Sequence, residues 1–274
     1  MSNSNYELTI KSNCHPKQHS NLFNHRLNEC GQDAHFQTFN KDINTYFFGV
    51  ADGVSGAENK NVNPAEFSLQ LCSNFKSVSE NIKTNNFTLK KITNLATQNL
   101  KVNGSSTFCA LSFNTSTGKL NSFNIGDSGY IILRPKLTKL TCIFKSEIQQ
   151  YDFNFPYQLS HTESGEINYK AVIESGNSQT FQLQKGDIVI IGTDGVFDNL
   201  FTTEIISIIQ PIYSNLSNVE DAQKMANEIV NLAKDPTKLN RFSPWVNEAK
   251  NNNMYTANIM YKPDDTTVLV SIIT

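Results

Sequence analysis

Residues 188–198 read Ile-Val-Ile-Ile-Gly-Thr-Asp-Gly-Val-Phe-Asp, an aliphatic run that ends in an aspartate followed by a glycine. Such a β-branched run predicts a strand. Residues 46–53 read Tyr-Phe-Phe-Gly-Val-Ala-Asp-Gly and repeat the arrangement. Asp194 and Asp52 therefore stand at the ends of two predicted strands. Each is followed by a glycine, whose backbone can approach a neighbouring group closely.

Two further predicted strands carry acids at their ends. Asp33 precedes one of them, and Asp264 with Asp265 opens the other. Taken alone, an Asp-Gly pair after an apolar run is most often a hairpin turn. If these strands are neighbours, however, several carboxylates meet at one edge, where like charges need cations to stay ionised.

We therefore expect a metal cluster at this edge. Oxygen-only ligation favours Mg²⁺ or Mn²⁺. Zinc is disfavoured because the chain has no H-E-x-x-H motif and no paired Cys/His arrangement.

The periodicity of the whole chain predicts the α+β class. Strands are expected at residues 34–39, 46–51, 107–113, 120–125, 130–133, 171–173, 181–183, 188–191 and 267–273. Helices are expected from Pro64, over residues 88–100 and between residues 203 and 234. Runs of strands and runs of helices follow one another without regular βαβ alternation, which favours two antiparallel sheets covered by helices.

The composition divides the chain into two parts. Residues 1–28 are rich in Asn, Ser and His and are interpreted as a polar N-terminal arm, with one short extended candidate at residues 6–10. Residues 29–274 are expected to form a single domain, because β-rich architectures of this size often fold as one unit. The 274 residues are 38% hydrophobic, which is enough apolar material for a sizeable core.

Charge and hydropathy argue against two classes of partner. The chain has 23 Lys plus Arg against 25 Asp plus Glu, a formal net charge of -2, so no basic field favours nucleic acid. No apolar run approaches the roughly 20 residues of a membrane span. The N-terminus shows no recognisable targeting segment, so a cytoplasmic location is expected.

The cysteines favour a reducing compartment. They are odd in number, widely spaced and never arranged as C-x-x-C: Cys14, Cys30, Cys72, Cys109 and Cys142. This pattern argues against a disulfide framework and against a thiolate zinc site.

Six stretches share their order and spacing with one known family. They are residues 31–35 (Gly-Gln-Asp-Ala-His), 48–53 (Phe-Gly-Val-Ala-Asp-Gly), 104–107 (Gly-Ser-Ser-Thr), 124–129 (Asn-Ile-Gly-Asp-Ser-Gly), 191–198 and 264–268 (Asp-Asp-Thr-Thr-Val). Over about residues 29–273 the chain resembles the metal-dependent protein phosphatase 2C family. This resemblance implies a central antiparallel β-sandwich flanked by helices. Residues 147–159 and 52–56 resemble more narrowly a compact subgroup, several of whose members are mitochondrial, so the mitochondrion is the alternative compartment.

The resemblance implies a role for each acid. Asp52 would bridge two metal ions, and the backbone carbonyl of Gly53 would bind one of them. Asp194 and Asp264 would complete the pair of sites, and Asp33 would act through metal-bound water. These four aspartates are also the implied catalytic residues.

The resemblance further implies the cofactors and the reaction. The cofactors would be two Mn²⁺ or Mg²⁺ ions, and Asp127 and Asp198 match positions that bind a possible weaker third ion. A water bridging two ions becomes acidic enough to supply hydroxide at neutral pH, which would attack a phosphoserine or phosphothreonine of a phosphoprotein substrate.

Several positions depart from the family pattern. Val54 stands where many members have a His that is proposed to protonate the leaving group. Asn28 replaces the Arg that grips the phosphate, and Gln32 replaces a Glu. Arg26 is the nearest cation, but we interpret it mainly as a solvated side chain. His35 lies on the same strand face as Asp33 and is interpreted as structural.

These departures motivate an alternative function. The chain could be a catalytically weak module of the same fold that binds a phosphoprotein partner and regulates it. Retention of all the acids argues against this alternative, because a module freed from catalysis should have lost some of them. The sequence carries no prediction of the oligomeric state.

Overall fold

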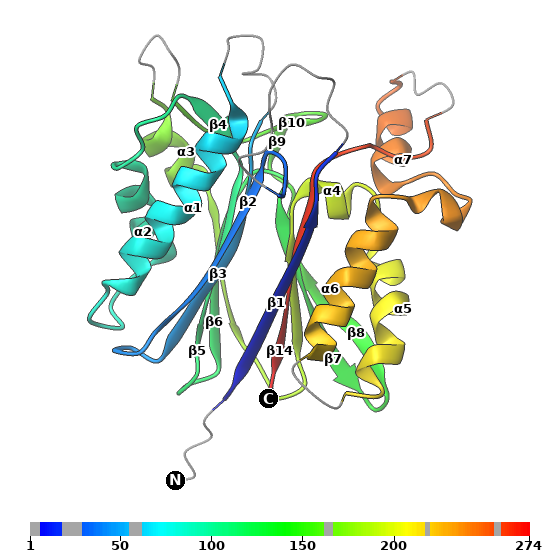
Figure 1. The fold of residues 1–274 in the computed structure, drawn as a ribbon, viewed down its shortest axis with the longest axis horizontal. Coiled ribbons are helices and arrows are strands. Elements are labelled where there is room, and N and C mark those ends of the chain that lie inside the picture. Colours follow the sequence, from blue (N-terminus) through cyan, green and yellow to red (C-terminus); the bar gives the residue numbers. More distant parts are fainter. Residues whose placement is uncertain (1–5, 18–28, 55–61, 162–166, 217–219, 255–258) are drawn as a thin grey trace.

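Two five-stranded antiparallel sheets lie at the centre of the computed structural model (Figure 1), which describes residues 6–17, 29–54, 62–161, 167–216, 220–254 and 259–274. The first sheet has the order β1 (Leu8–His15), β14 (Thr266–Ile273), β13 (Ile188–Gly192), β7 (Gly129–Lys136), β8 (Lys139–Lys145). The second has the order β12 (Asn177–Gln182), β6 (Lys119–Ile125), β5 (Phe108–Asn114), β3 (Thr45–Asp52), β2 (Asp33–Asn40). Two short ladders pair β4 (Gly104–Ser106) with β11 (Leu159–His161) and β9 (Gln150–Asp152) with β10 (Phe155–Pro156).

Helices flank both sides of the pair of sheets. On one side lie α1 (Pro64–Glu80), α2 (Leu89–Thr97) and α3 (Tyr169–Ser175). On the other side lie α4 (Asp194–Phe197), α5 (Thr202–Tyr213), α6 (Glu220–Ala233) and α7 (Pro244–Asn251), with a 3-10 turn η2 (Pro236–Leu239) after α6. Helix α1 begins where the sequence predicts it, because the Asn63 side chain accepts a hydrogen bond from the Ala65 amide and Pro64 occupies the first turn.

Side chains of the central strands alternate between two apolar interfaces. On β3, Phe48 and Val50 pack between the sheets, whereas Phe47 and Ala51 belong to the core beneath α1 and α2. Strand β13 repeats this alternation toward the helices of the other side. Because both faces of these strands are buried, their sequences are apolar without a break. The predicted α+β sandwich flanked by helices is confirmed.

One predicted strand is wrong. Residues 171–173 lie within α3, not in a strand. Their β-branched character suggests a strand, but Tyr169 and Ile173 are four residues apart and both pack into the core beneath the helices. Helical spacing therefore decides the local structure.

The predicted polar arm needs correction as well. Residues 8–15 form β1, which pairs with β14 along its whole length from Leu8 to His15. Its polar side chains are tolerated because β1 is an edge strand whose ladder uses backbone groups. Residues 1–5 and 18–28 of the expected arm lie outside the described residues.

Candidate functional site

The acids predicted from strand ends gather at one end of the sandwich, near α4 and β4 in Figure 1. A pocket of about 420 Å³ opens there, and its charged lining consists of Lys17, Asp52, Asp127, Asp194, Lys262 and Asp264. Gly53 and Val54 line it too. Because antiparallel neighbours run in opposite directions, this end collects the end of β3 and of β13 together with the start of β2 and the approach to β14. We call Asp33, Asp52, Asp127, Asp194, Asp198, Asp264 and Asp265 the acid cluster.

Hydrogen bonds and strand register connect acids that are remote in sequence. Asp33 and Asp52 are direct partners across the β2–β3 ladder. Asp33 is fully buried behind the pocket, and its Oδ2 accepts a 2.8 Å hydrogen bond from the Thr193 hydroxyl. Thr193 in turn precedes Asp194 at the start of α4. The two sheets are thus joined beneath the pocket.

Two lysines lie among the acids. The Lys262 ammonium donates to Asp194 Oδ2 and, at 2.9 Å, to Asp198 Oδ2, and it pairs with Asp264 Oδ2 at 3.2 Å. The Lys17 ammonium donates to Asp264 Oδ1 at 3.0 Å. Both oxygens of Asp264 are therefore paired with cations.

Burial and mutual repulsion disfavour ionisation of most of the acid cluster. Burial raises the pKa of Asp52 well above its usual range, and the charges of Asp194 and Asp33 add to this effect. Burial also raises the pKa of Asp127 to about 6 and that of Asp198 to about 7. Burial would likewise raise the pKa of Asp194, but the charge and hydrogen bond of Lys262 outweigh it and lower this pKa.

This electrostatic balance fits divalent cations. The lining acids supply only oxygen donors, the set that Mg²⁺ and Mn²⁺ prefer. Asp194 Oδ1 is buried and has no hydrogen-bond donor among the described residues. The same residues contain no three acidic, thiol or imidazole groups already arranged around one point for an ion. The carboxylates of Asp194, Asp198 and Asp264 are instead paired with Lys262, and Asp264 is also paired with Lys17.

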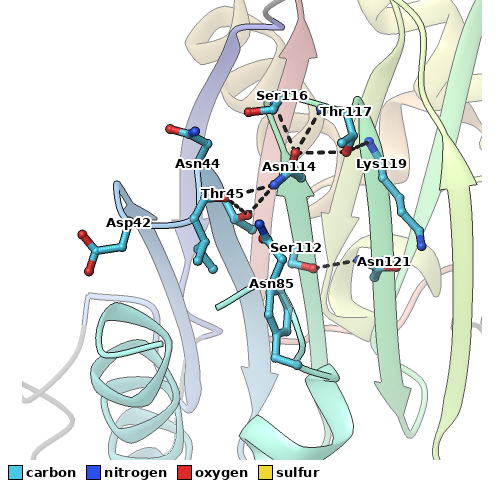
Figure 2. A pocket seen from close by; sticks show the side chains of 12 residues that line it. Asp42, Asn44, Thr45, Asn85, Ser112, Asn114, Ser116, Thr117, Lys119 and Asn121 are labelled. Atoms are coloured by element: carbon cyan, nitrogen blue, oxygen red, sulfur yellow. Dashed lines mark hydrogen bonds between the residues drawn. The ribbon is translucent and has the colours of Figure 1, made fainter. Parts of the chain in front are cut away.

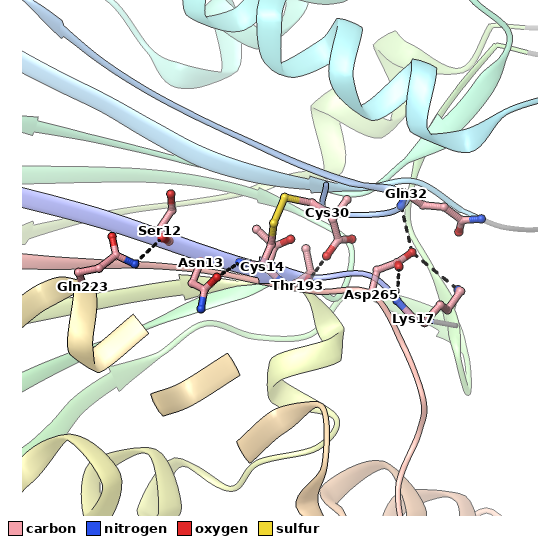
Figure 3. Close-up of a disulfide and its surroundings, with 11 residues drawn as sticks. Ser12, Asn13, Cys14, Lys17, Cys30, Gln32, Thr193, Gln223 and Asp265 are labelled. Carbon is pink, nitrogen blue, oxygen red and sulfur yellow. Dashed lines mark hydrogen bonds and ion pairs between the residues drawn. A yellow bond between two sulfur atoms is a disulfide. The ribbon is translucent and has the colours of Figure 1, made fainter. Parts of the chain in front are cut away.

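A disulfide lies beside the acid cluster and corrects an expectation from the sequence. Cys14, at the end of β1, is bonded to Cys30, which precedes β2 (Figure 3). The two residues are 16 apart in sequence, but the fold places the ends of their segments side by side. The expectation that the cysteines form no disulfide is therefore wrong for this pair, while Cys72, Cys109 and Cys142 are free thiols.

The segments joined by the disulfide hold Asp265. Its Oδ1 accepts a 2.8 Å hydrogen bond from the backbone amide of Lys17, and its Oδ2 accepts a 3.0 Å bond from the amide of Gln32 (Figure 3). Lys17 lies three residues after Cys14, and Gln32 lies two residues after Cys30. The disulfide thus joins two segments whose backbone amides both donate to Asp265, the residue that follows Asp264.

The structure brings Asp52, Asp194 and Asp264, which the strand-end pattern singles out, into one pocket with Gly53 and with Asp127, a position that only the resemblance implies. Asp33 and Asp198 lie next to this lining: Asp33 accepts a hydrogen bond from Thr193, and Asp198 accepts one from Lys262.

Sequence reasoning assigned no role to Lys17, Lys262 or Asp265. The position of Lys262 two residues before Asp264 was an available signal, whereas Lys17 lies in a polar segment with no local pattern.

The positions that depart from the family pattern lie in different surroundings. Val54 lines the pocket, so its apolar side chain stands where a proton donor was expected. Burial lowers the pKa of His35, which favours the neutral imidazole and disfavours a role as proton donor. Arg26 and Asn28 lie outside the described residues.

A second pocket of about 390 Å³ lies at the opposite end of the sandwich (Figure 2). Its central side chain is Asn114, whose amide group donates to the Ile43 carbonyl and to the Thr45 hydroxyl. The Asn114 oxygen accepts from the backbone amides of Ser116 and Thr117. These bonds stabilise the turn between β5 and β6, so the pocket is explained by hairpin structure.

None of the helices in the described ranges combines the length and the apolar character that a membrane crossing needs.

Comparisons with known proteins agree with this architecture. No protein-family model matches the chain. The chain is 27% identical to the photosystem II phosphatase PBCP, whose X-ray structure superposes with a TM-score of 0.77 and covers 98% of this chain and 99% of that one. The likeness therefore extends over the whole sandwich and its helices.

Curated sequences give the same result. Probable protein phosphatase 2C 55 of Arabidopsis thaliana is 33% identical over 247 residues, which are 89% of this chain and 48% of the relative. The chain thus spans about half the length of that relative. Protein phosphatase PTC7 homolog fig of Drosophila grimshawi is 34% identical over 232 residues, which are 81% of this chain and 73% of the relative. On sequence and fold together, the chain belongs to the protein phosphatase 2C family.

Proposed function

We propose that the chain is a divalent-metal-dependent protein phosphatase that hydrolyses phosphoserine and phosphothreonine in protein substrates. The observation that carries this proposal is the convergence of Asp52, Asp194 and Asp264 on one pocket, from the end of β3, the segment after β13 and the segment before β14. Family membership supplies the reaction class. Retention of these acids disfavours the alternative of a catalytically weak regulatory module, and no observation on the described residues favours it.

The proposed metal ligands are the ones that the resemblance implies. Asp52, the Gly53 carbonyl, Asp194 and Asp264 would hold two Mn²⁺ or Mg²⁺ ions. When bound, such ions lower the pKa of coordinated water from about 15.7 toward roughly 7 and neutralise charge on a phosphoryl group.

The chain's own residues position this donor set. Asp33 supports it from behind, because its hydrogen bond with Thr193 ties the β2 edge to the start of α4. Val54 contributes no proton, so the leaving alkoxide takes its proton from solvent held in the pocket. Lys17 lines the same pocket and supplies positive charge near the position that a phosphate would take.

The test is hydrolysis of a phosphothreonine peptide with Mn²⁺, with and without excess chelator. We expect activity only with the metal, and Asp194→Asn is expected to reduce kcat/KM by a factor on the order of 1,000, as loss of a group central to transition-state stabilisation does. Asp42→Asn is the matched control, because Asp42 lines the remote pocket and pairs with Lys83 at the surface. Activity that resists both chelation and Asp194→Asn would refute the proposal.

The compartment stays a prediction: the cytosol, with the mitochondrion as the alternative. Because Cys14 and Cys30 form a disulfide, the cysteines no longer favour a reducing compartment. Imaging of the tagged full chain tests this prediction.

A further inference from the structure

The two acids that match a third metal position are both already bonded to protein donors. Asp198 Oδ2 accepts from the Lys262 ammonium at 2.9 Å. Asp127 Oδ2 accepts from the Gln150 side-chain amide at 2.8 Å, and Gln150 lies on β9. Donors from separate parts of the chain thus take one oxygen of each acid.

The backbone of Lys262 is fixed next to Asp198 by a buried side chain. Its backbone amide donates to Asn199 Oδ1 at 3.0 Å, and its carbonyl accepts from Asn199 Nδ2 at 2.8 Å. Asn199 is 1% exposed and also donates to the Gly195 carbonyl at the start of α4. One buried amide therefore fixes the backbone of Lys262 relative to the helix that carries Asp194 and Asp198.

The Lys262 ammonium faces three acids: it donates hydrogen bonds to Asp194 and Asp198 and forms an ion pair with Asp264. Such a group has three N–H donors, and its partners are Asp194, Asp198 and Asp264. The side chain is only 16% exposed. Two cations about 4 Å apart repel each other strongly where water is largely excluded, so a divalent ion and this ammonium compete for the same oxygens.

The Lys262 ion pairs leave some oxygens of the proposed metal ligands without a cation partner. Lys262 takes Asp194 Oδ2, whereas Asp194 Oδ1 has no donor among the described residues. Asp52 is not a partner of Lys262 in any described ion pair. The ammonium thus contacts Asp198 directly, whereas no described ion pair joins it to Asp52.

We propose that Lys262 is a positioning residue whose ammonium group replaces the third divalent ion, so that this chain binds two ions. Gln150 completes the replacement by holding Asp127. This inference rests on the proposed function, because it concerns the metal content of the same site.

The experiment counts Mn²⁺ ions by isothermal titration calorimetry and by electron paramagnetic resonance of the free ion, with the full chain. We expect two ions per wild-type chain and two in Asp198→Asn, because Asp198 binds Lys262 and not an ion. Lys262→Met is expected to bind a third ion, and Lys262→Met combined with Asp198→Asn to lose it again. Lys262→Arg keeps the positive charge and is expected to bind two.

Lys17→Met is the matched control, because it removes the other ammonium that pairs with Asp264. It is expected to leave the count at two. Three ions in the wild type, or loss of an ion in Asp198→Asn, would overturn the inference and leave the proposed function standing. Absence of any bound Mn²⁺ in the wild type would overturn both. If Lys262→Met fails to fold, the Asp198→Asn count still decides.

Discussion

At the scale of single residues, the site depends on Gly31, a glycine to which the sequence alone assigns no role. Gly31 has φ +72°, a conformation that L-residues with side chains rarely adopt. A Cβ atom there would clash with the Asp265 carboxylate. Gly31 therefore allows the segment before β2 to lie against the Asp265 carboxylate, which accepts hydrogen bonds from the backbone amides of Lys17 and Gln32.

Gly31→Ala is expected to destabilise the protein by about 1–3 kcal/mol, because it combines backbone strain with a clash. It is also expected to lower kcat/KM by a factor on the order of 10 to 100, because Asp264 and Lys17 are displaced with Asp265. Urea denaturation and phosphopeptide kinetics measure the two effects.

Gly118→Ala is the matched control. Gly118 has φ +69°, and a Cβ atom there would clash with the Tyr6 ring near the remote pocket, so its replacement should cost similar stability and leave kcat/KM unchanged. Equal kinetic effects of the two substitutions would contradict the role given to Gly31.

Prediction from sequence succeeds for some residues of the site and fails for others for a physical reason. Asp52 and Asp194 can be found because each ends an apolar run, and local pattern is what a sequence shows. Lys262 and Lys17 act through ion pairs with partners up to 247 positions away, which leave no periodic trace. Long-range charge pairing becomes visible only after folding.

At the scale of elements, β1 shows how a polar edge strand escapes prediction. Its half-buried, mostly polar sequence lacks apolar alternation, yet it pairs with β14 over eight residues. The short strand ladders and α7 were missed for the same reason, because pairing partners and tertiary packing define them. By contrast, β3 and β13 are buried on both faces and are predictable from their apolar runs.

Loss of the Cys14–Cys30 disulfide is expected to loosen the junction of β1 with β2. Closing a loop of this length stabilises a protein by about 3 kcal/mol in the chain-entropy account. Urea denaturation with dithiothreitol should therefore show a lower free energy of unfolding than without it. The β1–β14 ladder should keep the reduced protein folded.

The double variant Cys14→Ser/Cys30→Ser serves as the control for this measurement. Its stability should match that of the reduced wild type and should not respond to dithiothreitol. A response of similar size in the variant would mean that the stabilisation comes from elsewhere, because the remaining cysteines are free thiols.

At the scale of the whole molecule, the sandwich gathers buried carboxyl groups at one end of its two sheets. The folded state raises the pKa of Asp127 to about 6 and of Asp198 to about 7, mainly by burial, from an ordinary value of 3.8. Between about pH 4 and pH 7 the folded chain therefore binds more protons at these groups than the unfolded chain. Their contribution to stability decreases as pH rises through this window.

In the presence of chelator, we expect the melting temperature to decrease between pH 5 and pH 7.5. The variant Asp127→Asn/Asp198→Asn should show a flatter profile, because the amides do not titrate. Differential scanning calorimetry in matched buffers gives both curves. Parallel curves for wild type and variant would show that other groups determine the pH dependence.

The central claim is that strand ends from both sheets create one divalent-metal site. The most direct measurement is anomalous diffraction at the manganese edge from crystals grown with Mn²⁺. We expect anomalous peaks in contact with Asp52, Asp194 and Asp264. Peaks bound only elsewhere, or none at saturating Mn²⁺, would contradict it.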